Sequence, residues 1–124
     1  SFFERFKKKK KLYLKPGQRI FKDSDVDGGS GLLRLNKREA GSSGRRKLAF
    51  ADWDGDGDLD LLANSKNTEL YENVGGNTFK NKGNLHDRKL AGHSTSPTIV
   101  DWDKDGKPNL LIGAEDGFFY YLAE

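Results

Sequence analysis

The chain contains an internal repeat with an offset of 49 residues. Its copies are ADWDGDGDLDLLAN at 51–64 and VDWDKDGKPNLLIG at 100–113, and the alignment continues with Leu70-Tyr71 on Phe119-Tyr120. Short apolar segments alternate with Gly, Asn and Asp turns, and none is long enough for a helical period. A repeat of this length filled with short strands is typical of a propeller blade. The repeat therefore predicts an all-β chain of four-stranded antiparallel β-propeller blades.

The repeat also predicts how the chain is divided. We expect a basic N-terminal segment at 1–11, a partial or degenerate blade at 12–46, a complete blade at 47–95 and a partial last blade at 96–124. A closed propeller needs at least about four blades, whereas 124 residues supply about two and a half at this period. We therefore expect the chain to be a fragment of a larger propeller, or one member of a ring that other chains complete.

Each copy of the repeat carries acidic residues at alternate positions of a tight turn. So many neighbouring carboxylates repel one another unless a cation lies among them, and hard oxygen ligands suit Ca²⁺. Gly57 permits the sharp bend at the sixth position, and the seventh position offers its main-chain carbonyl. We predict two Ca²⁺ sites, formed by Asp52, Asp54, Asp56, Asp58 (carbonyl) and Asp60, and by Asp101, Asp103, Asp105, Lys107 (carbonyl) and Asn109.

Other metal sites fit these loops less well. An EF-hand needs a bidentate Glu at position 12 between two helices, but Ala63 and Ile112 stand there and the flanking segments are predicted strands. The chain has no Cys, which excludes Cys-ligated zinc and disulfides. Because Asn109 lacks the charge of Asp60, we expect the second site to bind more weakly. A third loop is predicted at DSDVDGGSG, with Asp23, Asp25 and Asp27, and an ordinary Asp/Gly turn is its alternative.

The strings ADWDGDGDLDLLANS and VDWDKDGKPNLLIGAEDGFFYYL resemble the FG-GAP/VCBS repeats of β-propeller proteins, which include integrin α-subunit propellers and many bacterial secreted proteins. The resemblance implies that the ten loop residues named above are calcium ligands. It also implies a calcium-stabilised scaffold that is secreted, periplasmic or on the cell surface, and that binds a glycan or a protein. The alternative implied by bacterial relatives is part of a polysaccharide lyase that acts on acidic polysaccharide.

A lyase needs a base, an acid and a group that neutralises a uronate carboxylate. His93 is the candidate base, Tyr120 or Tyr121 the candidate acid, and the cations at 45–47, Arg46 among them, are the candidate neutralising groups. The structural alternative is a hydrogen-bonding corner for His93 and packing for the tyrosines. Trp53 and Trp102, which recur within the two loops, are predicted to pack between blades rather than against a sugar.

Charge is unevenly distributed along the chain. Residues 1–50 contain 15 Lys and Arg against 5 acidic residues, whereas residues 51–124 contain 7 against 14. The basic half, with its run from Lys7 to Lys11, suggests an anionic partner such as a phosphate polymer, an acidic polysaccharide or the acidic face of another protein. The run lacks the interleaved base-reading side chains of a nucleic-acid site. No apolar run is long enough to span a membrane.

Overall fold

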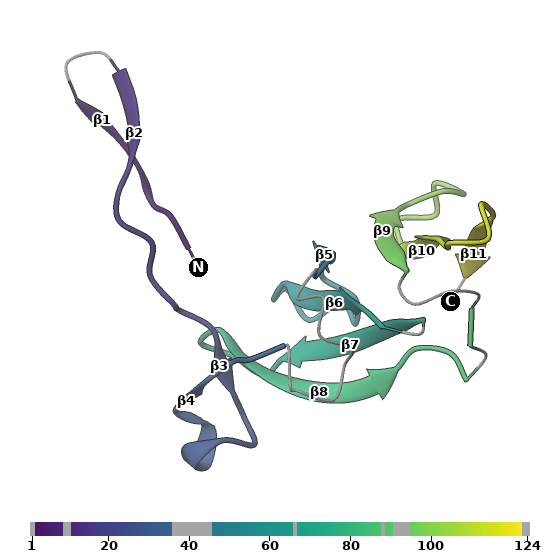
Figure 1. Cartoon of the computed structure of the whole chain (residues 1–124), viewed down its shortest axis with the longest axis horizontal. Coiled ribbons are helices and arrows are strands. Elements are labelled where there is room, and N and C mark those ends of the chain that lie inside the picture. The colour runs from purple at the N-terminus through teal and green to yellow at the C-terminus, as the bar shows by residue number, and fades with distance from the viewer. Residues whose placement is uncertain are drawn as a thin grey trace.

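The computed structural model of the chain describes residues 2–8, 11–35, 46–65, 67–87, 89–90 and 95–122 (Figure 1). These residues form strands and one short 3₁₀ turn, η1 (Asp27–Gly29), without an α-helix, which confirms the all-β prediction. The strands are β1 (Arg5–Lys8), β2 (Lys11–Leu14), β3 (Lys22–Asp23), β4 (Gly31–Leu32), β5 (Leu48–Ala51), β6 (Asp60–Asn64), β7 (Thr68–Asn73), β8 (Thr78–Asn84), β9 (Ser96–Val100), β10 (Asn109–Gly113) and β11 (Phe119–Leu122).

Strands β5 to β8 form a four-stranded antiparallel meander, and β9 to β11 form a three-stranded one. The first two strands of each meander pair in the same register, because Phe50 lies opposite Leu61 and Ile99 lies opposite Leu110, both shifted by 49 residues. The two sheets are therefore structural copies, compatible with propeller blades, and we call them the first and second blade.

The third strand departs from the predicted alignment. Leu62 lies opposite Leu70 in the first blade, whereas its equivalent, Leu111, lies opposite Tyr121 and not opposite Phe119. The physical reason is the preceding connection, which spans residues 65–67 in the first blade and the longer stretch 114–118 in the second. The predicted match of Leu70-Tyr71 with Phe119-Tyr120 is therefore wrong by two residues.

Alternate residues of β6 serve two different cores, which explains why the whole strand is buried. Leu61 packs on one side with Tyr71 and Phe79, against Phe21, Leu33 and Leu35 of the preceding segment. On the other side, Leu62 packs against Leu110 and Ile112 of the second blade. Period-two alternation thus places each neighbour on its own face of the first blade.

The segment before the first blade adds two strands to the edge of that blade formed by β8. β3 pairs in parallel with β8, and β4 pairs antiparallel with β3, which gives the six-stranded order β4-β3-β8-β7-β6-β5. Further along, β1 and β2 form a hairpin that projects away from the blades (Figure 1). The predicted boundaries at residues 11, 46 and 95 stay predictions.

Tyr71, in the core with Leu61 and Phe79, should make the stability of the protein depend on pH in the alkaline range. Burial raises the pKa of Tyr71 to about 12, and the negative charge of Glu69 raises it further. The Tyr71 hydroxyl donates a hydrogen bond to Glu69 Oε2 at 3.2 Å. An unfolded tyrosine ionises near pH ~10, so the folded state keeps its proton longer and the free energy of unfolding falls between pH ~10 and ~12. In denaturant titrations over this window, Tyr71→Phe should reduce the fall by about 2 kcal/mol. An equal fall in both proteins would contradict this.

Candidate metal centre

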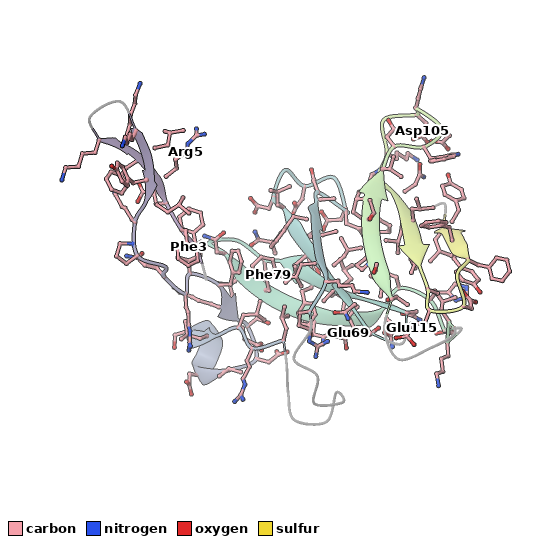
Figure 2. All side chains as sticks on the ribbon, turned by 45° about the horizontal axis from the view of Figure 1, so that its top comes forward. Phe3, Arg5, Glu69, Phe79, Asp105 and Glu115 are labelled. Atoms are coloured by element: carbon pink, nitrogen blue, oxygen red, sulfur yellow. The ribbon has the colours of Figure 1, made fainter. Side chains whose placement is uncertain are left out.

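The two acidic loops occupy the same position in the two blades. Residues 52–59 connect β5 to β6, and residues 101–108 connect β9 to β10. Figure 2 shows the second loop, with Asp105 labelled, projecting beyond the ends of its strands. The repeat in sequence is therefore a repeat in space, and each blade presents one loop.

In the first loop, Asp52, Asp54 and Asp60 each offer a carboxylate oxygen within 4.8 Å of the others. The turn is closed by the Gly57 N–H, which donates to Asp52 Oδ2 at 3.0 Å. Gly57 has a φ of 94°, a backbone conformation that glycine adopts without steric cost. The sharp bend that the sequence predicts at Gly57 is present here, and it brings the three carboxylates together.

The second loop also gathers three carboxylates, although its group includes the fifth residue of the loop in place of the ninth. Asp101, Asp103 and Asp105 offer carboxylate oxygens within 4.8 Å of one another. The Gly106 N–H donates to Asp101 Oδ2 at 3.0 Å, which matches the bond of Gly57 in the first loop. The seventh residue also behaves alike, since Lys107 N donates to Asp105 Oδ1 at 2.8 Å and Asp58 N to Asp56 Oδ1 at 2.9 Å.

The ninth residue closes each loop, a role that the sequence analysis missed. Asp60 is 1% exposed, and its two oxygens accept the N–H groups of Trp53 and Asn73, both at 2.8 Å. Asn109 Oδ1 accepts the equivalent N–H of Trp102 at 2.9 Å. An amide oxygen can therefore replace the carboxylate in closing the loop, which explains why Asn is accommodated at this position. The recurrence of an oxygen acceptor at position nine was the available signal.

Two further observations favour a bound cation in the first loop. Asp52 Oδ1 is buried and has no hydrogen-bond partner, a costly arrangement unless another group satisfies it. Partial desolvation raises the pKa of Asp54, and the negative charges of Asp60 and Asp56 raise it further, against the lowering effect of the Asp56 N–H. Several hard oxygens without nitrogen or sulfur donors form the ligand set that Ca²⁺ prefers.

Comparison with known proteins gives a family match. Residues 52–112, which contain both acidic loops, match the family model of the FG-GAP-like repeat. This segment belongs to the FG-GAP-like repeat family. Repeats of this family form propeller-like scaffolds that are typically extracellular. No curated protein and no solved structure matches the chain, and the described residues include no helix suited to crossing a membrane.

The third predicted loop lies before the FG-GAP-like repeat. Asp23 is buried at the end of β3, and its Oδ1 accepts the Asp25 N–H at 3.0 Å. Asp27 opens the η1 turn with a φ of 49°. Among the described residues, these three carboxylates do not form a group like those of the two repeat loops. Metal binding there stays a prediction.

Two of the candidate catalytic residues, Arg46 and Tyr120, have structural partners. Arg46 donates to the main-chain oxygens of Asn64 and Leu35, at 3.0 and 2.6 Å, and so ties the start of the repeat to the preceding segment. The Tyr120 hydroxyl donates to Asp116, and this bond lowers the pKa of Asp116. His93 lies outside the described residues. The catalytic roles of these residues stay predictions.

The two loop tryptophans differ in environment. Trp53 is half-buried and packs in the core between the blades, as predicted. Trp102, its copy in the second blade, is 65% exposed. The difference follows from the neighbour, because the second blade covers Trp53 and no described residue covers Trp102 to the same extent.

Proposed function

We propose that the FG-GAP-like repeat binds two Ca²⁺ ions, one in each acidic loop, and that these ions stabilise an extracellular scaffold. The observation that carries the proposal is the buried and unpartnered Asp52 Oδ1 within a group of three carboxylates. The recurrence of the same loop-closing bonds in the second blade supports it. A bound cation would satisfy the buried oxygen and offset the repulsion among the carboxylates.

The residues that would hold each ion follow from the loops. In the first loop they are Asp52, Asp54, Asp56, the carbonyl of Asp58, and Asp60; in the second they are Asp101, Asp103, Asp105, the carbonyl of Lys107, and Asn109. A Ca²⁺ ion would supply two positive charges and six to eight coordination positions for oxygen. Its role would be structural, since it would fix the connection between the first two strands of each blade.

Calorimetric titration tests this proposal. We expect Ca²⁺ to bind at two sites per chain, and Mg²⁺ to bind much more weakly because it requires near-ideal octahedral geometry. Asp52→Asn should remove the first binding event and Asp101→Asn the second, each leaving the other in place. A titration in which Ca²⁺ produces no saturable heat would overturn the proposal.

Asn109→Asp should strengthen the second site. The substitution restores the charge that Asp60 carries in the first loop, and a carboxylate oxygen can still accept the Trp102 N–H. An added charge at short range should raise the affinity for Ca²⁺ about 10-fold, or about 1.4 kcal/mol.

The matched control is Asn81→Asp, which adds the same charge on β8, where the side chain accepts the Gly83 N–H at 2.7 Å. It should leave both affinities nearly unchanged. An equal gain in the two variants would show that net charge, and not coordination, sets the affinity.

We further propose that the scaffold binds a glycan or a protein and packs against the remainder of a propeller, supplied by the same parent chain or by others. The family's scaffold character supports this proposal. The chain should bind an acidic polysaccharide or a protein ligand without forming the unsaturated uronate that a lyase releases. If the absorbance of the unsaturated uronate appears during incubation with the wild-type chain, and does not appear with His93→Ala, the lyase alternative would be established instead.

A further inference from the structure

The main chain of Trp53 is joined to all three carboxylates that gather in the first acidic loop. Two of them belong to its neighbours in sequence, Asp52 and Asp54. The third belongs to Asp60, whose Oδ2 accepts the Trp53 N–H at 2.8 Å. A displacement of these carboxylates therefore displaces the main chain of Trp53 as well.

The side chain of Trp53 belongs to the core between the two blades. It packs against a buried cluster in which Leu62 of the first blade meets Leu110 and Ile112 of the second. Strand β9 contacts both β5 and β6 along the same boundary (Figure 1). Because such cores are densely packed, a displacement on one side is transmitted to the other. Trp53 therefore connects the first acidic loop to the packing of one blade on the next.

The second loop provides an internal comparison. Its tryptophan, Trp102, donates its main-chain N–H to Asn109 Oδ1 at 2.9 Å, as Trp53 donates to Asp60. The Trp102 side chain is 65% exposed, however, whereas Trp53 is half-buried in the core. The two tryptophans therefore share a main-chain hydrogen bond and differ in the packing of their rings.

We propose that Trp53 couples calcium binding in the first loop to the packing of the two blades. The inference rests on the proposed calcium site and adds a positioning residue that is not a ligand. When the carboxylates are held together, the main chain of Trp53 is fixed and its ring stays in the core. When the blades are packed, the ring is fixed and the carboxylates are held close to one another. The coupling is reciprocal, so each event favours the other by the same factor.

Calorimetric titration of chains with one intact loop tests the role of the ring. In the Asp101→Asn chain, Trp53→Ala should weaken Ca²⁺ binding to the first loop at least about 5-fold. Alanine keeps the N–H that Asp60 accepts, so the loss reports the ring alone. Trp53→Phe, which keeps a large apolar ring, should restore most of the affinity.

The matched control is Trp102→Ala in the Asp52→Asn chain. It removes an exposed ring from the second loop and keeps the main-chain N–H that Asn109 accepts, so it should leave the affinity of that loop nearly unchanged. Equal losses in the two loops would contradict the coupling, because the ring would then act on the loop alone. Parent chains that bind no Ca²⁺ would contradict the calcium sites themselves.

A substitution in the other blade tests the coupling at a distance. Ile112→Ala opens the core from the second blade, outside the first loop, and should also weaken Ca²⁺ binding to that loop about 5-fold in the Asp101→Asn chain. The milder Ile112→Val should have a smaller effect in the same direction. Phe79→Leu alters the core on the opposite face of the first blade and should leave the affinity unchanged. Equal effects of Ile112→Ala and Phe79→Leu would show general destabilisation and overturn the proposal.

Tryptophan fluorescence gives a readout that does not depend on affinity. The chain has two tryptophans, so Trp102→Phe leaves Trp53 as the emitter and Trp53→Phe leaves Trp102. Added Ca²⁺ should shift the Trp53 emission to shorter wavelength, since the ring is then held in the apolar core, and should change the Trp102 emission much less. Calorimetric binding of Ca²⁺ without a change in Trp53 emission would overturn the coupling and leave the calcium site in place.

Discussion

Removing Ca²⁺ with EDTA is expected to lower the Tm of the chain by about 10–20 °C. A ligand at 100 times its Kd stabilises the folded state by about 2.7 kcal/mol per site, so two sites contribute about 5 kcal/mol. In a domain of this size, 1 kcal/mol corresponds to a few degrees of Tm. Without the ion, the buried Asp52 Oδ1 is left unsatisfied and the loop carboxylates repel one another. Differential scanning calorimetry with and without the chelator measures the shift.

The control for chelation is the double variant Asp52→Asn/Asp101→Asn. It lacks a carboxylate at the first position of both loops, so EDTA should change its Tm by only a small fraction of the wild-type shift. Added Ca²⁺ in excess should restore the wild-type Tm. A wild-type Tm that does not respond to EDTA would show that calcium has no stabilising role.

Asp60→Ala is expected to lower the free energy of unfolding by about 2–5 kcal/mol, even in EDTA. The Asp60 side chain accepts the N–H groups of Trp53 and Asn73, both at 2.8 Å, in a site that is 1% exposed. Each buried donor that loses its acceptor costs about 1–3 kcal/mol. Measuring in EDTA removes the contribution of the ion, so denaturant titration reports the hydrogen bonds alone.

Two variants separate this effect from a general effect of charge. Asp60→Asn keeps one acceptor oxygen, as Asn109 does in the second blade, and should cost less than Asp60→Ala. Asp58→Ala removes an exposed carboxylate from the same loop and should change the free energy of unfolding by less than about 0.5 kcal/mol. Equal effects of Asp60→Ala and Asp58→Ala would refute the loop-closing role.

The elements with a strong pattern were predictable from the sequence. The strands around the two loops, and the loops themselves, follow from Asp at alternate positions and Gly at the sixth, since each residue acts locally. The register of β5 against β6 also follows, because Leu48 to Ala51 and Asp60 to Asn64 flank a loop of defined length. Local features of this kind do not depend on how distant parts of the chain pack.

Other features depend on contacts that a single sequence does not show. The parallel pairing of β3 with β8 joins residues more than 50 positions apart, and no local pattern predicts it. The shift of β11 arises in the residue 114–118 connection, which interrupts the repeat. The second hydrogen bond of Asp60 is accepted from Asn73 on the neighbouring strand β7, so the double role of Asp60 appears only in three dimensions.

Native mass spectrometry in calcium-containing buffer tests the central claim most directly. The wild-type chain should carry two Ca²⁺ ions per polypeptide, and Asp52→Asn and Asp101→Asn should each carry one. The double variant should carry none. A wild-type chain that shows only its metal-free mass under these conditions would contradict the assignment of both loops as calcium sites.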